Sequence, residues 1–81
     1  MTTLHNRTTR ATQVYFDAER IHVCLSDGRE ISAPLEWFPR LRHATDDQRR
    51  QWELIGSGVG IHWEAIDEDI SVAGLLGLPN D

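Results

Sequence analysis

The clearest folding signal in the chain spans residues 21–33 and reads Ile-His-Val-Cys-Leu-Ser-Asp-Gly-Arg-Glu-Ile-Ser-Ala. Its first five residues alternate, which places Ile21, Val23 and Leu25 on one face of a strand. The Asp-Gly pair that follows separates two such runs, and Gly accepts the positive φ that a tight turn requires. The stretch therefore predicts a β-hairpin with its turn at Asp27 and Gly28.

A further strand is expected before this hairpin. Residues 12–16, Thr-Gln-Val-Tyr-Phe, are rich in β-branched and aromatic side chains. The polar residues 17–20 form a loop, and Pro34 ends the last strand of the group. The first half of the chain is therefore predicted to form a three-stranded antiparallel meander.

The middle of the chain carries helical signals. A short irregular helical segment is expected around Pro39, because proline favours the first position of a helix. Thr45-Asp46-Asp47-Gln48 has the pattern of a capping box, and its two acids lie at the positive end of the helix dipole. The helix is expected to continue through Leu54 with Trp52 as its anchor.

The last third supplies one more strand and one more helix. The glycine-rich link 56–60 lacks the lysine of a phosphate-binding loop and is interpreted as a helix end and a turn. Residues 61–63 predict a fourth short strand, and Asp69 or Ser71 is expected to cap a helix over 72–76. The predicted fold is α+β, a small antiparallel sheet (three-strand meander plus a fourth short strand) with two to three short helices packed on it. Residues 12–77 are expected to form this single domain, between a flexible N-terminal tail at 1–11 and a C-terminal tail at 78–81.

The composition favours a protein partner over a nucleic acid. The 81 residues include 13 acids and 8 basic residues, which are all arginine, for a formal net charge of -5. Residues 53–81 contain acids and no arginine. Because phosphate binding needs a basic face, this charge weighs against nucleic-acid binding and favours an acidic surface for a basic partner.

Neither a signal peptide nor a membrane-spanning segment is expected from the sequence. The N-terminus lacks an apolar core segment, and no apolar run approaches the about 20 residues that span a bilayer. Cys24 is the only cysteine, which is typical of a reducing compartment. The sequence predicts a cytoplasmic protein with no membrane association.

No arrangement of residues predicts an enzyme or a cofactor. His62, Asp67, Glu68 and Asp69 include metal-ligating side chain types, but their spacing fits no known metal loop. His22 and Cys24 share a strand face without an oriented base or an electropositive setting. A metal-dependent enzyme is therefore the least favoured of the functions considered, and no metal or cofactor is expected.

Three tryptophans in so small a chain supply either core or interface anchors. Trp52 and Trp63 fit the core better, and Trp37 is expected to be partly exposed. An alternative surface for nucleic acid consists of the basic group Arg40, Arg42, Arg49 and Arg50. Asp46 and Asp47 oppose that role, because they occupy the helix start that would meet a phosphate.

Several motifs together resemble a known family. They are Leu25-Ser26-Asp27-Gly28-Arg29, Pro34-Leu35 with Trp37-Phe38-Pro39-Arg40-Leu41, Ala44-Thr45 with Gln48-Arg49 and Trp52, Gly60-Ile61-His62-Trp63, and Ile66 to Val72 with Leu75-Leu76. Over residues 12–76 the chain resembles the bacterial domain of unknown function family 2442. The resemblance implies a small α+β fold with an antiparallel sheet. It also implies gene pairs that look like toxin–antitoxin modules, and it supplies no catalytic residues.

The function predicted from the sequence is that of a non-enzymatic, antitoxin-like binding module. It presents an acidic surface to a small, basic partner protein encoded nearby. Asp67, Glu68 and Asp69 are the expected charged contacts, with Trp37 or Trp63 as the apolar anchor. The alternative is a nucleic-acid-associated transcriptional regulator, with a homodimer as one possible arrangement, acting through the arginine group.

Overall fold

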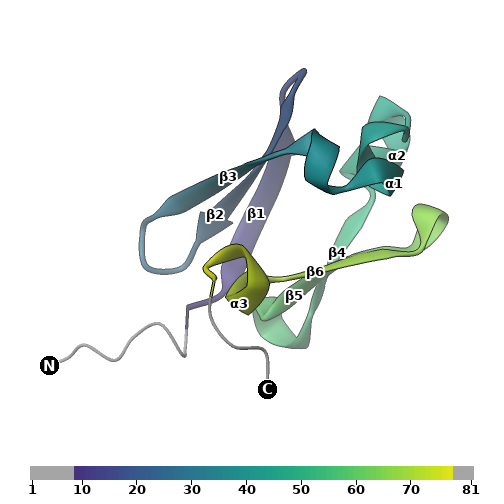
Figure 1. The fold of residues 1–81 in the computed structure, drawn as a ribbon. Coiled ribbons are helices and arrows are strands. Elements are labelled where there is room, and N and C mark those ends of the chain that lie inside the picture. Colours follow the sequence, from purple (N-terminus) through teal and green to yellow (C-terminus); the bar gives the residue numbers. More distant parts are fainter. Residues whose placement is uncertain (1–8, 78–81) are drawn as a thin grey trace, which may run out of the picture.

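The computed structural model describes residues 9–77, which form two three-stranded antiparallel sheets and several short helices (Figure 1). The first sheet has the order β1-β2-β3. Its strands are β1 (Ala11–Phe16), β2 (Arg20–Leu25) and β3 (Glu30–Pro34). The predicted meander is confirmed, with His22 opposite Ser32 and Val23 opposite Ile31.

The turn between β2 and β3 forms where the Asp-Gly pair predicts it. The Leu25 amide donates to the Arg29 carbonyl at 2.8 Å, and the Gly28 amide donates to the Leu25 carbonyl at 3.1 Å. Gly28 has φ 95°, a left-handed conformation that costs other residues about 1–2 kcal/mol. The Asp27 carboxylate accepts from the Arg29 amide, which closes the turn.

The helical segments of the middle region are short. They are η2 (Leu35–Trp37), α1 (Pro39–Arg42) and α2 (Asp46–Arg50). The capping box is present, because the Gln48 amide donates to Thr45 Oγ1 and the Thr45 amide donates to Gln48 Oε1, each at 3.0 Å. Pro39 occupies the first turn of α1, as expected.

The expectation of a helix through Leu54 is wrong. The helix ends at Arg50, and Trp52–Ile55 is strand β4 of a second sheet. This sheet has the order β4-β5-β6, with β5 at Gly60–Trp63 and β6 at Glu68–Ser71. Pairing with β5 outweighs the weak helical preference of residues 51–54, because strand formation depends on cross-strand contacts as well as on the propensity of the strand's own residues.

The sequence predicts a single fourth strand over residues 61–63. In the structure this strand is β5, the central strand of a second meander. The glycine-rich link forms η3 (Gly56–Gly58) and the turn between β4 and β5, rather than the end of a helix. The segment η4 (Glu64–Ile66) leads to Asp67, and part of the acidic run belongs to β6. The α+β class is confirmed, and the arrangement of its strands is two sheets instead of one.

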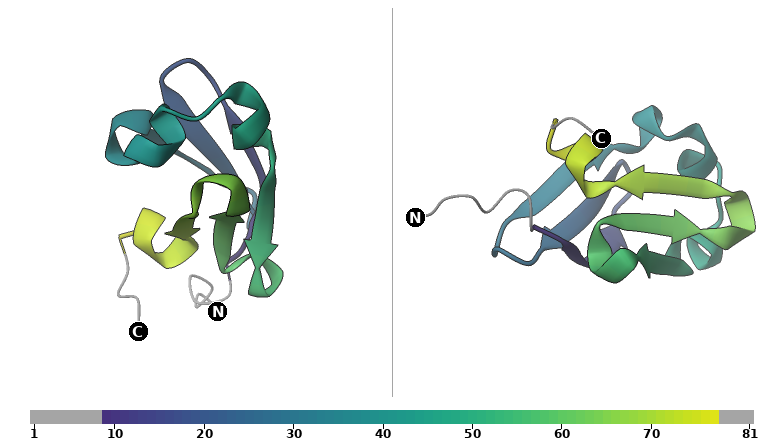
Figure 2. Two further views of the ribbon diagram at one scale, coloured as in Figure 1. Left: turned by 90° about the vertical axis from the view of Figure 1, so that its right-hand side faces the viewer. Right: turned by 90° about the horizontal axis from the view of Figure 1, so that it is seen from below.

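The two sheets pack around one hydrophobic core, with α1 and α2 together at one end of the molecule and α3 (Val72–Leu75) apart from them (Figure 2). The largest fully buried side chains among residues 9–77 are those of Trp63, Ile21, Leu41, Ile61 and Val23. The alternation predicted for β2 supplies two of them, which fixes the face that the first sheet turns inward.

The ends of the described region are tied to the core. Thr9 and Ala11 are buried, and β1 begins at Ala11, so the expected tail 1–11 overlaps packed residues. Residues 1–8 and 78–81 lie outside the described residues. At the other end, Ser71 Oγ accepts from the Gly74 amide at 2.9 Å and caps α3 (Val72–Leu75). Between residues 9 and 77, none of the helices is long and apolar enough to cross a membrane.

Candidate partner-binding groove

Trp37 is the most exposed large apolar side chain among the described residues. It leaves 69% of its surface in solvent, as the sequence predicts for this residue. Its segment η2 follows Pro34 and ends before Pro39, and neighbouring Leu35 is buried. The short helix thus anchors itself through Leu35 and turns the adjacent indole outward.

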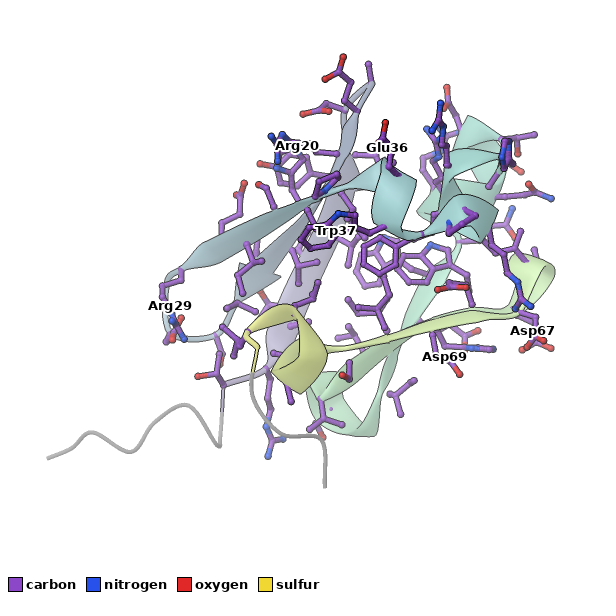
Figure 3. The ribbon with its side chains drawn as sticks, in the orientation of Figure 1. Arg20, Arg29, Glu36, Trp37, Asp67 and Asp69 are labelled. Carbon is purple, nitrogen blue, oxygen red and sulfur yellow. The ribbon has the colours of Figure 1, made fainter. Side chains whose placement is uncertain are left out.

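A groove of about 400 Å³ lies beside this indole. On one side it is lined by Trp37 of η2 and by Phe38, the residue that follows. On the other side it is lined by Asp69–Ser71 of β6 and by Gly74 and Leu75 of α3. Figure 3 shows Trp37 beside η2 and Asp69 on β6, which passes below η2 and α1 in this view. We call this feature the β6 groove. It brings together two of the residues that the sequence predicts as partner contacts.

The acidic run lies at the turn before β6 and along the strand. Asp67 adopts the left-handed conformation, with φ 53° and ψ 50°, and 92% of its side chain is exposed. Arg40 Nη1 donates to the Asp67 carbonyl oxygen and lies 3.8 Å from the Asp67 carboxylate. Glu68 is half-buried, and the Asp69 side chain is 67% exposed. The run is therefore on the surface, with part of its charge compensated internally.

His62 supplies a further part of that compensation. It is the cross-strand neighbour of Asp69, whose carboxylate contacts His62 Nδ1, and Glu64 Oε1 lies 2.7 Å from His62 Nε2. Glu64 and then Asp69 raise the pKa of His62 to about 9. His62 is thus an imidazolium at neutral pH. Sequence reasoning grouped His62 with Asp69 only as metal-ligand types and missed Glu64, because these ion pairs appear only once the register of β5 and β6 is known.

The arginine group does not form a shared basic surface. Arg49 is 15% exposed and donates to the Leu41 and Arg42 carbonyl oxygens, each at 2.9 Å. Its guanidinium also lies 5.7 Å from the centre of the Phe16 ring. Arg49 therefore ties the end of α1 to α2.

The other three arginines of the group face acids of this chain. Besides the contact of Arg40 with Asp67, Arg42 lies 3.9 Å from Glu36 and Arg50 lies 3.5 Å from Asp47. Exposed pairs of this kind contribute about 0–1 kcal/mol each. They nevertheless lower the positive charge that a phosphate would meet.

Trp63 lies in the core. Its side chain is fully buried, and its indole Nε1 donates to the Arg49 carbonyl oxygen at 3.0 Å. Its ring also meets the edge of Phe16, with the ring centres 6.3 Å apart. The alternative of a core role therefore holds for Trp63, and Trp37 is left as the exposed candidate for an apolar anchor.

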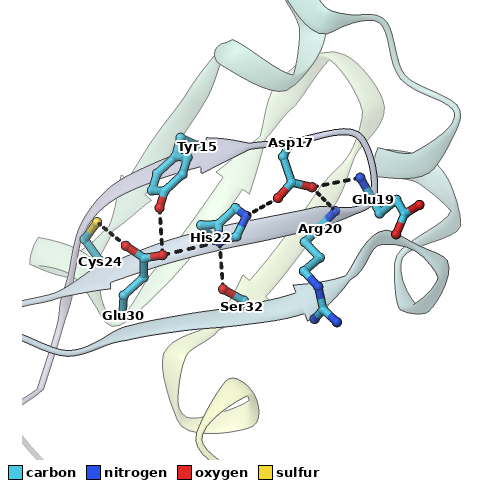
Figure 4. Close-up of polar contacts among 8 residues, drawn as sticks. All are labelled: Tyr15, Asp17, Glu19, Arg20, His22, Cys24, Glu30 and Ser32. Atoms are coloured by element: carbon cyan, nitrogen blue, oxygen red, sulfur yellow. Dashed lines mark hydrogen bonds and ion pairs between the residues drawn. The ribbon is translucent and has the colours of Figure 1, made fainter.

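A second polar cluster covers the outer face of the first sheet (Figure 4). His22 Nε2 lies 2.7 Å from Asp17 Oδ2, and His22 Nδ1 lies 2.7 Å from Ser32 Oγ. Tyr15 stacks on the His22 ring and donates from its hydroxyl to Glu30 at 2.7 Å. The hydrogen bond to Glu30 raises the pKa of Tyr15 to about 12.

This cluster does not activate a nucleophile. Burial, together with the nearby Glu30 carboxylate, raises the pKa of the Cys24 thiol, so the thiol stays protonated at neutral pH. His22 contacts Asp17 and Ser32 through its two nitrogens, and Cys24 Sγ lies 3.8 Å from Glu30 Oε1. Across the part of the chain that the structure describes, no three His, Cys, Asp or Glu side chains are grouped to hold a metal ion.

Two solved structures are similar to this chain over most of its length. One is a crystal structure of a protein of unknown function from Rhodospirillum rubrum, with 34% identity and a TM-score of 0.71 over 90% of this chain and 92% of that one. The other is a solution NMR structure of an uncharacterised protein from Chromobacterium violaceum, with 28% identity and a TM-score of 0.74 over 91% of this chain and 70% of that one. No curated protein matches the chain.

A family model gives the same relationship across nearly the whole domain. It matches residues 11–78 and describes a protein of unknown function, DUF2442. The matched region begins with β1 and includes both sheets and all the described helices. Neither the family description nor the two solved structures indicates an enzymatic activity. The chain belongs to the DUF2442 family of proteins of unknown function.

Proposed function

We propose that this protein is a non-enzymatic binding module of antitoxin-like type. Its β6 groove receives a small, basic partner protein. One observation carries the proposal: the exposed indole of Trp37 lines the same groove as Asp69. An apolar anchor beside a carboxylate suits a partner that presents an apolar side chain next to a lysine or an arginine.

The size of the apolar contribution follows from the exposure of Trp37. An aromatic side chain buries about 150–250 Å² when it is covered completely, and 69% of Trp37 is still exposed. Covering about 150 Å² at about 25 cal/mol per Å² gives an upper value of about 4 kcal/mol. That is a large share of the free energy of a micromolar complex, which is about 8 kcal/mol.

The acids near the groove affect the specificity and the rate of association more than the affinity. The exposed carboxylates of Asp67 and Asp69 face solvent near the groove, so their field reaches an approaching protein. Arg40 and His62 reduce this field without removing it, because the region around β6 also holds Glu64 and Glu68. Association is therefore expected to slow as salt is added.

The test begins with the protein encoded beside this one. Both proteins are co-expressed, and the affinity of the purified pair is measured by calorimetry. We expect Trp37→Ala to weaken binding by at least about tenfold, and Asp67→Asn to weaken it less. Asparagine tolerates the left-handed backbone at this position, so the second variant keeps the turn.

Glu19→Arg is the matched control, because Glu19 is an exposed acid outside the β6 groove. It changes the net charge of the protein more than Asp67→Asn does. If Trp37→Ala binds as tightly as the parent protein while both remain folded, the β6 groove is not the binding surface. A stoichiometric complex that loses affinity only in Glu19→Arg would place the contact elsewhere.

A further inference from the structure

We propose that the partner contributes an extended segment that pairs with the outer edge of β6 at Asp69 as an additional strand. This inference rests on the proposed function and specifies how the partner is recognised. The segment alternates apolar and basic residues. Its backbone bonds to β6, its apolar side chains enter the β6 groove, and its basic side chains lie beside Asp67 and Asp69.

The position of β6 in its sheet leaves one side open. The strand order is β4-β5-β6, so β5 is the one described strand that pairs with β6. The register places Ile61 opposite Ile70 and His62 opposite Asp69. The Val72 amide donates to the Val59 carbonyl oxygen at 2.9 Å, which makes the pair at that level a hydrogen-bonded one.

In an antiparallel ladder, hydrogen-bonded pairs recur at every second residue. The backbone groups of Ile70 therefore point to β5, and those of Asp69 point away from it. Two residues before Asp69, the Asp67 carbonyl oxygen accepts from Arg40 of α1 and not from β5. This contact agrees with backbone groups that point away from β5 at this end of β6. The amide and carbonyl of Asp69 are thus directed at the position that a new strand would occupy.

The two faces of β6 differ, and this difference specifies the side chains of the added strand. Ile70 is buried on the inner face, next to the indole and phenyl rings of Trp37 and Phe38 at the groove. Asp69 lies on the outer face with His62. Side chains alternate along a strand, so the partner would place apolar residues inward and cations outward. Opposite charges in neighbouring cross-strand positions contribute about 0.2–1 kcal/mol per pair.

The same charges disfavour a second copy of this chain on the edge. Two β6 strands in an antiparallel pair would bring the carboxylates of Asp67 and Asp69 from both copies together. Like charges in such positions are destabilising. Charged side chains on an edge strand normally prevent indiscriminate pairing. Here the negative charge excludes self-association and admits a basic strand.

A synthetic peptide tests the inference directly. The probe is a capped peptide, Thr-Lys-Val-Arg-Val-Lys-Thr, added to the isotope-labelled protein and followed by NMR. We expect the Trp37 indole resonance to shift and exchange of the Asp69 amide with solvent to slow at least about tenfold. A peptide methylated on the backbone nitrogens that face β6 keeps every side chain. It is expected to bind at least about tenfold more weakly, because it lacks the bonding amides.

Each result has one interpretation. Binding at Trp37 that is insensitive to backbone methylation overturns strand addition, although the β6 groove still binds the partner. A peptide with glutamate in place of its basic residues that binds equally well overturns the charge pattern. If millimolar probe leaves the Trp37 and Asp69 resonances unmoved, strand addition by such a segment is wrong. The calorimetry with the neighbouring gene product decides the proposed function separately.

Discussion

Replacing Arg49 with lysine is expected to destabilise the domain although it preserves the charge. Lysine and arginine have similar helix propensities, so α2 itself is little affected. The Arg49 guanidinium donates to two carbonyl oxygens, those of Leu41 and Arg42, and packs over Phe16. A lysine ammonium lacks the planar fork that reaches both oxygens at once.

The magnitude follows from these contacts. A hydrogen bond from a charged donor contributes about 1.5–3 kcal/mol. The contact with the ring adds about 0.5–1 kcal/mol. Losing one bond and the ring contact predicts a loss of about 2–4 kcal/mol in the free energy of unfolding. With a urea dependence of about 1 kcal/mol per molar for so small a domain, the unfolding midpoint moves down by about 2–4 M.

The assay is equilibrium unfolding in urea, followed by tryptophan fluorescence, which changes when the buried Trp63 is exposed to solvent. Arg50→Lys is the matched control, because Arg50 is the next residue of α2, is 70% exposed and contacts only Asp47 among the described residues. Its effect is expected to stay within about 0.5 kcal/mol. Equal midpoints for the two variants would refute the structural role of Arg49. The arginine would then be available for the nucleic-acid surface that the sequence offers as an alternative.

Two further predictions concern stability. The raised pKa of His62 stabilises the fold fully below the ordinary value of 6.5, and this stability is lost as the pH rises through about 9. The unfolding free energy of the parent protein should therefore fall between about pH 6.5 and 9, and this fall should be smaller in His62→Gln. An equal fall in both proteins would contradict the stabilising contacts of His62 with Glu64 and Asp69. Gly58→Ala would place a Cβ 2.4 Å from the Ala11 carbonyl oxygen at φ 111°, and a loss of at least about 3 kcal/mol is expected in thermal unfolding. Gly28→Ala has φ 95° and open space around it, so its loss of about 1–2 kcal/mol separates the backbone effect from the collision.

The first sheet was predictable because its signals are local. The alternation of β2 and the Asp-Gly turn each lie within a few residues, and the structure confirms both. The capping box at Thr45 is equally local, and it is present. These features need no knowledge of distant contacts.

The second sheet was predicted only in part, because its strands depend on one another. Residues 52–55 have no clear alternation of burial, and Leu54 and Ile55 remain exposed. Only their pairing with β5 makes them a strand. The contacts of His62 and Arg49 depend likewise on register and on helix ends. The acidic run was visible in the sequence, but its left-handed turn and its strand were not.

The pairing of strands has a consequence for how the chain acquires its structure. In the described part of the chain, every strand hydrogen-bonds to a strand adjacent to it in the sequence. Closing short loops carries a small entropic cost, so each meander can assemble without waiting for distant segments. Proteins dominated by such local contacts refold faster than those whose sheets join remote segments. We therefore expect this domain to refold faster than a β-sandwich of similar length whose sheets join remote segments.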